Sequence, residues 1–230
     1  MHKQINYISQ EEWQKLNSVI VNARDKLIIN TIYHTGCTVS ELVRIKVKDV
    51  DFVNSMIYFP AENTKSRKDR FSRIPVSLAF RLKSYLELIG DEKNQDVFVF
   101  GSNKQSAISE NRVRQIVKKY ADKAGIQKVY GVDSKGRKLY AVTVHTLRHS
   151  HIKHAIDKNV PLQAIMKQVG HSNIRTTKFY YNLSANDVKQ AYEQAGFDDS
   201  DEEELMFGSD EPNMSNMPNS GDYGDYDADS

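Results

Sequence analysis

Apolar residues recur at helical spacing over the first part of the chain. Ser9, with Glu12 three positions later, forms a capping-box pattern that predicts a helix running to about residue 21. The segment 24–34 places apolar residues on one face of a second helix, and Gly36 follows as a stop signal. A short third helix is predicted over 39–45.

The spacing then changes to one typical of strands. Residues 56–76 contain two β-leaning runs around a polar, strongly basic centre, which predicts a hairpin with an exposed tip. We expect a helix over 77–89, a short buried strand over 97–100 and another helix over 109–124. A second hairpin is predicted over 128–143.

The last third of the chain divides into a helical part and a polar tail. From residue 145 the pattern is helical almost to residue 196, with breaks at 159–161 and at Gly170. After residue 197 the composition is too polar to bury a core, so we expect disorder. These elements predict a mainly α fold with small antiparallel β-hairpins (α+β), as one domain over 1–197 with a disordered acidic tail over 198–230.

Charge is distributed unevenly along the chain. The tail holds 12 Asp and Glu and no Lys or Arg, so the preceding 197 residues carry all 32 Lys and Arg against 18 Asp and Glu. A basic body with an acidic tail favours a polyanionic partner, and it favours nucleic acid only slightly. Ordinary solubility is the alternative interpretation of the same charge.

Cysteine content and hydropathy exclude several classes of protein. Cys37 is the only cysteine, so neither an internal disulfide nor a zinc site of several thiolates is available. No run approaches the roughly 20 apolar residues of a membrane span, and the first residues do not resemble a signal peptide. We therefore expect a soluble, cytoplasmic protein with no membrane partner and no metal.

Residues 143–156 contain four histidines and one arginine. His145 and Arg148 are three positions apart at a helix start and so share a face. A zinc-binding helix would place Glu between two histidines four apart, and this segment does not. His149, His151 and His154 are therefore interpreted as packed or exposed helix residues.

The stretch VGHSNIRTTKFYY (169–181) adds a second candidate group. His171 precedes Tyr180 by nine residues. The planar fork of an arginine matches two phosphate oxygens, a histidine can bond or protonate them, and a tyrosine hydroxyl can attack phosphorus. Further cations lie on the first predicted hairpin: Lys65, Arg67, Lys68, Arg70 and Arg73. Taken alone, a tyrosine or histidine on an amphipathic helix is more often an ordinary core or rim residue.

Three strings together resemble one family. TGCTVSELVRIKVKDVDF (35–52), HTLRHSHIKHAI (145–156) and VGHSNIRTTKFYYNL (169–183) resemble the tyrosine recombinases, or phage integrase family. The family patterns are T-G-x-R-x-S-E-L, H-x-L-R-H-S and L-G-H-S-x-x-x-T-T-x-x-Y, and the resemblance covers roughly residues 10–196. It implies the catalytic-domain fold of that family and site-specific recombination or integration of DNA, without metal, ATP or any other cofactor.

The resemblance also implies a role for each residue of the site. Tyr180 matches the nucleophile that forms a 3′-phosphotyrosine link, and its spacing from His171 favours it over Tyr181. His171 matches the position that hydrogen-bonds the scissile phosphate. His145 and Arg148 match the first histidine and second arginine of the site. The hairpin would supply Lys65 as the acid for the 5′-oxygen, with Lys68 as the alternative, and Arg67, Lys68, Arg70 and Arg73 as DNA-binding residues.

One position departs from the pattern. The first arginine of the family falls at position 38, which is Thr38, and Arg44 lies almost two helical turns further on. A missing cation on a phosphoryl transition state costs roughly 10³–10⁵ in rate, by analogy with arginine fingers. The leading interpretation is a recombinase of reduced activity. A DNA-binding regulator that has lost cleavage is the alternative, and a type IB topoisomerase-like relaxing enzyme is a third.

The family also suggests partners. The catalytic pattern begins almost at once, so we expect a catalytic-domain-only member or a fragment, lacking the usual preceding clamp domain and helped by an accessory protein. Residues 184–196 resemble the helix that members dock into a neighbouring subunit, which implies a tetramer on double-stranded DNA. Such proteins often travel with viruses or other mobile elements.

Overall fold

The structure is a computed structural model that describes residues 6–90, 94–101 and 106–171. The chain divides into two units, Met1–Asn182 and Leu183–Ser230, and every described residue belongs to the first. The expected end of the domain at residue 197 and the acidic tail therefore lie outside the described residues.

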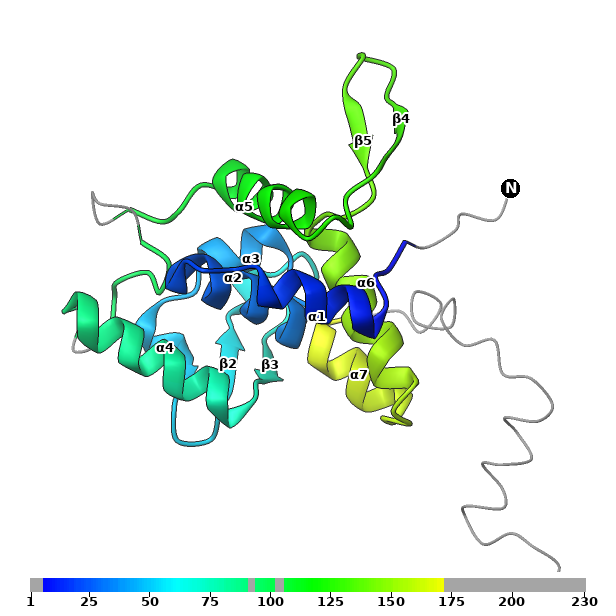
Figure 1. Cartoon of the computed structure of the whole chain (residues 1–230). Helices are drawn as coiled ribbons and strands as arrows, with labels where there is room; N and C mark the ends of the chain where they lie inside the picture. The colour runs from blue at the N-terminus through cyan, green and yellow to red at the C-terminus, as the bar shows by residue number, and fades with distance from the viewer. Residues whose placement is uncertain (1–5, 91–93, 102–105, 172–230) are drawn as a thin grey trace, which may run out of the picture. The chain divides into compact units, whose positions relative to one another are not determined.

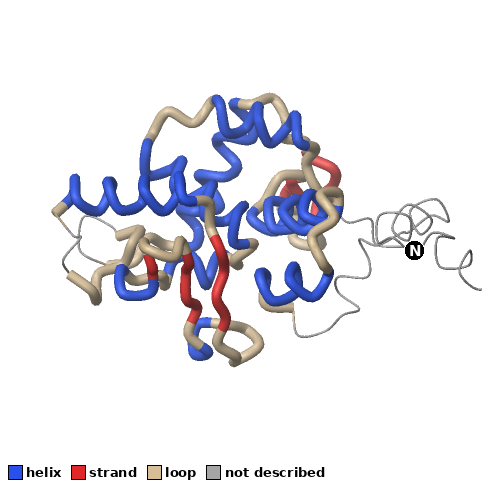
Figure 2. Tube along the Cα trace, turned by 90° about the horizontal axis from the view of Figure 1, so that it is seen from below, coloured by secondary structure: helices blue, strands red, loops and turns tan. Residues whose placement is uncertain are grey.

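Helices dominate the described part, with two small antiparallel sheets (Figures 1 and 2). The α-helices are α1 (Gln10–Ser18), α2 (Ala23–Thr35), α3 (Val39–Val43), α4 (Val76–Ile89), α5 (Glu110–Lys123), α6 (Val144–Ile156) and α7 (Leu162–Val169). The strands are β1 (Val50–Asp51), β2 (Met56–Phe59), β3 (Arg70–Arg73), β4 (Val129–Val132) and β5 (Lys138–Tyr140), and two 3₁₀ turns cover Val47–Asp49 and Ala61–Asn63.

Local signals at helix ends act as the sequence predicts. Ser9 and Glu12 form both bonds of a capping box at the start of α1. Gly36 ends α2 in the left-handed conformation, with its N–H donating to Ile32 O. The first helix is shorter than expected, because it ends at Ser18.

Helix α2 is the centre of the core. Most of its side chains are buried, and it packs against α4 and α6. The core cluster that includes its buried residues also contains Leu16 of α1, Leu82 of α4 and Ile116 of α5. A helix enclosed on most sides must be apolar around most of its circumference, which explains the unbroken apolar run of residues 27–29.

The first hairpin has one strand more than the sequence indicated. β1 pairs with β2, and β2 pairs with β3, all antiparallel, with Ile57 opposite Ser72 and Phe59 opposite Arg70. The two-residue β1 is too short to produce an alternating pattern, so nothing in the sequence marks it.

The strand expected over 97–100 is absent from the described structure. This segment forms turns with one isolated bridge, between Phe98 and Lys46. Val99 and Phe100 are nevertheless buried. Burial without regular pairing produces the same apolar run as a core strand, which explains the wrong prediction.

The second hairpin, β4–β5, extends beyond the helices that carry it (Figure 1). Its strands pair antiparallel with an irregular register between Val129 and Gly131. Val129, Tyr130 and Val132 are exposed. The hairpin predicted over 128–143 is confirmed, and it turns at residues 134–136 with Gly136 in the left-handed region.

Candidate functional site

The first turn of α6 positions two of the predicted site residues. Thr143 caps the helix in a capping box with Thr146, which fixes where α6 begins. His145 then faces outward and is exposed, whereas Arg148, one turn later, is buried. The start of α6 therefore carries an exposed imidazole, that of His145, and a buried guanidinium, that of Arg148.

Arg148 joins the ends of two other helices. Its guanidinium donates to Gly36 O at the end of α2 and to Val169 O in the last turn of α7, the latter at 2.7 Å. Carbonyl groups at a helix C-terminus carry partial negative charge, so a cation is favoured there. Two such ends hold this arginine in one orientation.

The end of α7 fixes the backbone of His171. Gly170 adopts φ +72°, and the N–H of His171 donates to Met166 O at 3.0 Å. This is the type of turn that ends a helix through a left-handed glycine. His171 is therefore held directly after the helix end to which Arg148 is bound.

Arg70 lies in the same region, in a place the sequence did not indicate. It was expected on an exposed hairpin surface, but it is 6% exposed and forms an ion pair with Glu41 of α3. Its Nε donates to Glu41 Oε1 at 3.2 Å and its Nη2 to Glu41 Oε2 at 3.1 Å. The burial follows from register, since Arg70 and Ser72 point to the inner face of β3.

The other basic residues of the hairpin are exposed. Lys65, Arg67, Lys68 and Arg73 all stand toward solvent. Burial is the main cause that lowers the pKa of His145, followed by the charges of Arg148, Arg114 and, least of all, Lys65. The predicted acid on the hairpin and the predicted first histidine on α6 therefore interact electrostatically.

We call Lys65, Arg70, His145, Arg148 and His171 the basic cluster. Burial, followed by the charges of Arg148, His149 and Arg70, lowers the pKa of His171 to about 4. Partial loss of solvent lowers the pKa of His145 although its ring is accessible, and the Arg148 charge adds to this. Both imidazoles are therefore mainly neutral at pH 7, while the guanidiniums carry charge.

The remaining histidines of α6 fit the interpretation given from sequence. His154 is buried, and its Nδ1 bonds Tyr33 Oη at 2.7 Å. His151 stands edge-on to the ring of Tyr33, which stacks on Trp13. These two histidines therefore pack between helices. His149 is half-buried, and burial lowers its pKa to about 4.

Among the residues that the structure describes, no group of His, Cys, Asp or Glu could hold a metal ion. Cys37 is fully buried, and that burial raises the pKa of its thiol to about 12. A thiol that stays protonated at pH 7 is a poor nucleophile and ligand. The described chemistry of this region is that of arginine, lysine and histidine.

Sequence reasoning missed four residues at the site. Glu41 and Gln168 hold Arg70 through their side-chain and backbone oxygens, respectively. Arg114 and Lys118 of α5 line a pocket that also includes His145. Glu41 lies within the family-like string TGCTVSELVRIKVKDVDF (35–52), so its place at the site could have been predicted. The α5 cations are regularly spaced surface residues outside the three strings, and nothing in the sequence indicates their place.

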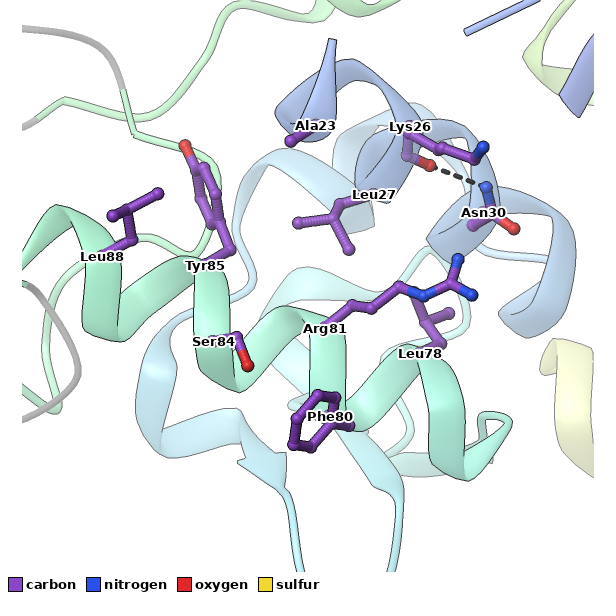
Figure 3. A pocket seen from close by; sticks show the side chains of 10 residues that line it. All are labelled: Ala23, Lys26, Leu27, Asn30, Leu78, Phe80, Arg81, Ser84, Tyr85 and Leu88. Atoms are coloured by element: carbon purple, nitrogen blue, oxygen red, sulfur yellow. Dashed lines mark hydrogen bonds between the residues drawn. The ribbon is translucent and has the colours of Figure 1, made fainter. Parts of the chain in front are cut away.

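A second hollow lies between α2 and α4 and shares no residue with the basic cluster (Figure 3). Leu27, Leu78 and Tyr85 form its apolar wall, with Phe80 and Arg81 at its edge (Figure 3). Its polar group Asn30 is already bonded to Lys26 O at 2.8 Å. The hollow has the character of a surface groove between packed helices.

Several predicted residues cannot be placed. Tyr180, Tyr181, the segment 184–196 and the tail 198–230 lie outside the described residues. Within the described part, every helix is too short or too polar to cross a membrane.

Known proteins resemble this chain over most of its length. It is 34% identical over 190 residues to the tyrosine recombinase XerA of Thermococcus onnurineus, a match covering 82% of this chain and 62% of that protein. It is 29% identical over 174 residues to the tyrosine recombinase XerD of Staphylococcus saprophyticus, covering 74% of this chain and 54% of the other. The chain thus spans less than two thirds of the length of these relatives.

Solved structures share the fold. The crystal structure of XerA recombinase superposes with a TM-score of 0.65 at 26% identity, over 85% of this chain and 66% of that one. XerH recombinase bound to its difH substrate gives 0.63 at 23% identity, over 83% and 55%. The described helices and hairpins therefore form the tyrosine recombinase catalytic-domain fold.

The family pattern extends well beyond the three short strings that first suggested it. It matches residues 6–187 and so includes every element described above from α1 to α7. The chain belongs to the phage integrase family.

Proposed function

We propose that this chain cuts and rejoins DNA as a site-specific recombinase or integrase, through a covalent 3′-phosphotyrosine link and without metal or ATP. The observation that carries the proposal is the position of Arg148, buried between the ends of α2 and α7 with His145 before it and His171 beside it. An enclosed guanidinium next to two neutral imidazoles suits a phosphodiester, which needs positive charge and hydrogen-bond donors.

The proposed role of each side chain of the site follows from its protonation state at pH 7. Arg148 supplies permanent charge, because guanidinium groups do not lose their proton in proteins. His171, with its pKa near 4, is neutral at pH 7 and donates one hydrogen bond to a phosphate oxygen without titrating. Lys65 is exposed at the hairpin tip, where it can move to the substrate.

The covalent step assigned to Tyr180 conserves atoms and charge. The phenolic oxygen bonds to phosphorus as the bond between phosphorus and the 5′-oxygen breaks. The phenolic proton passes to the neutral His145 imidazole, and Lys65 gives a proton to the departing 5′-oxygen. The phosphotyrosine link preserves the energy of the broken bond, so a 5′-hydroxyl can reverse the step on the same or another strand.

Double-stranded DNA is the proposed partner. The excess of Lys and Arg over Asp and Glu in the first 197 residues favours a polyanion, and the fold neighbours include recombinases solved with DNA. We propose that copies assemble on DNA through residues 184–196, and that a further protein or domain supplies the second half of the DNA clamp. DNA affinity should fall steeply as salt rises.

Covalent trapping tests the proposal. The protein is mixed with nicked suicide duplexes in EDTA, denatured in SDS and examined for a protein–DNA band, with Tyr180→Phe and Tyr181→Phe as matched variants. The proposal predicts a band that is lost only in Tyr180→Phe.

Two other outcomes would point elsewhere. Salt-sensitive DNA binding without a band would favour the regulator that Thr38 suggests. Relaxation of supercoiled plasmid with no sequence preference would favour the topoisomerase-like activity.

A further inference from the structure

The phosphate site lacks a cation at position 38, and the structure shows what occupies that place. Thr38 is the N-cap of α3, and its Oγ1 accepts the N–H of Glu41 at 3.2 Å. In return, Glu41 Oε2 accepts the N–H of Thr38 at 2.7 Å and its hydroxyl at 3.0 Å. Residue 38 therefore contacts a buried carboxylate.

The same carboxylate holds Arg70. Glu41 Oε2, which bonds Thr38, also accepts from Arg70 Nη2 at 3.1 Å. The Glu41 carboxylate therefore bridges the Arg70 guanidinium and residue 38, the position where the family pattern has an arginine. Arg44, the nearest arginine in sequence, is exposed at the other end of α3.

Arg70 is also tied to the rest of the site. Its Nη1 donates to Gln168 O at 2.7 Å, one residue before the carbonyl of Val169 that Arg148 binds. Its aliphatic Cδ lies against Gly170, where an added Cβ would come within 2.6 Å. Two guanidiniums therefore bind successive carbonyls of one helix end, directly before His171.

Burial and charge favour an ionic role. Glu41 and Arg70 are 5% and 6% exposed. Burial alone would raise the pKa of the Glu41 carboxyl, but the charge and bonds of Arg70, together with the Thr38 N–H and the Arg148 charge, outweigh it and hold that pKa below its ordinary value. The pair is therefore ionised, and the Arg70 charge contributes to lowering the pKa of His171.

We propose that Arg70, although it is paired with Glu41, partly compensates for the arginine missing at position 38, as a positioning residue whose guanidinium holds His171 and the end of α7 beside the phosphate site. The inference rests on the proposed cleavage of DNA. It gives a site with Thr38 a second guanidinium, and it assigns Glu41 the role of anchoring that guanidinium.

The test separates charge from structure. The rate of adduct formation is measured for wild type, Arg70→Met, Thr38→Arg/Arg70→Met and Arg44→Met. Each protein is given two substrates. One is the suicide duplex that forms an adduct in the trapping experiment, and the other is the same duplex with a neutral methylphosphonate at the cleaved position. Glu41→Gln/Arg70→Met removes both charges of the buried pair, which avoids leaving one charge alone. Circular dichroism and urea unfolding establish that each variant is folded.

We expect Arg70→Met and Glu41→Gln/Arg70→Met to react at least about a hundredfold more slowly than wild type on the ordinary phosphate. On the methylphosphonate, which needs less positive charge, their rates should come within about threefold of wild type. Thr38→Arg/Arg70→Met, in which the guanidinium introduced at position 38 can pair with Glu41, should regain at least about tenfold. The exposed Arg44→Met should stay within about threefold.

Three results would overturn the inference. Folded variants without Arg70 that react at the wild-type rate would show that its charge is not needed. An equal defect on both substrates would assign Arg70 a purely structural role. A wild-type protein that forms no adduct with any duplex would contradict the proposed function itself, and the inference with it.

Discussion

The β2–β3 and β4–β5 hairpins both consist of short antiparallel strands, but they differ in how far they are buried against the helices. β2–β3 has a buried inner face, with Ile57, Phe59 and Ser72, and it packs against α7. β4–β5 exposes Val129, Tyr130 and Val132 and extends beyond the helices (Figure 1). The difference teaches that a strand pattern predicts pairing, while burial depends on what the other elements bring to each face.

The difference in burial also determines how much an ion pair of an arginine on each hairpin contributes to stability. Arg70 on β3 is enclosed with Glu41 and the end of α7. Arg137, beside the turn of the second hairpin, pairs with Asp133 in an exposed contact at 2.7 Å. Exposed pairs contribute only about 0–1 kcal/mol, whereas breaking a buried pair costs about 3–5 kcal/mol.

The largest effect should come from separating the buried pair. Glu41→Ala leaves the Arg70 guanidinium buried without its carboxylate and removes a capping partner of Thr38. We expect the free energy of unfolding to fall by about 3–5 kcal/mol, measured by urea denaturation. Arg137→Ala, which breaks the exposed pair of the second hairpin but leaves the turn bonds of Asp133 in place, is the matched control, and equal losses in the two variants would remove the distinction between the hairpins.

A smaller loss is expected where a glycine touches Arg70. Gly170→Ala combines a left-handed backbone with a Cβ placed 2.6 Å from Arg70 Cδ, whereas Gly136→Ala, at φ +77° in the second hairpin, meets nothing within 4 Å. Both should lose about 1 kcal/mol from backbone strain, and Gly170→Ala about 1–3 kcal/mol more from the close contact. Thermal unfolding of the two variants measures the difference, and indistinguishable midpoints would show that α7 adapts freely.

The site should also make stability depend on pH. The pKa of His171 and that of His149 are lowered to about 4, so the unfolded chain binds more protons than the folded one between about pH 6.5 and pH 4. Their contribution to stability is present above pH 6.5 and is lost as pH falls toward 4. Urea midpoints from about pH 4.5 to 7.5 should rise with pH, and less steeply in His171→Gln; an unchanged slope would contradict the assigned environment.

The smallest effect is predicted on the outer face of the second hairpin. Tyr130 is 61% exposed, so Tyr130→Ser should change the free energy of unfolding by less than about 0.5 kcal/mol. Urea denaturation of wild type and Tyr130→Ser measures this change in the free energy of unfolding. A loss above about 1 kcal/mol would mean that this hairpin is packed in solution.

The sequence predicted most of the helices because their signals are local. Capping residues, left-handed glycines and the apolar spacing of α2, α4 and α5 each depend on neighbours within four positions. The failures occurred where contacts are distant. β1 is defined only by its pairing with β2, and residues 97–100 are buried without forming a strand.

The site was predictable in part for the same reason. Arg148, His145 and His171 lie in short strings with recognisable spacing, and their positions at the ends of α6 and α7 agree with it. The burial of Arg70 was not predictable, because it depends on Glu41 and Gln168, which are 29 and 98 residues away in sequence. A buried ion pair between separate elements leaves no periodic mark on either of them.

The most direct test of the central claim is to identify the residue that carries DNA. The trapped adduct is digested with nuclease and protease, and the peptide bearing the nucleotide is sequenced by mass spectrometry. The account predicts a 3′-linked nucleotide on Tyr180 in a reaction run in EDTA. A nucleotide on Tyr181 or any other residue, or an adduct that requires added metal, would contradict it.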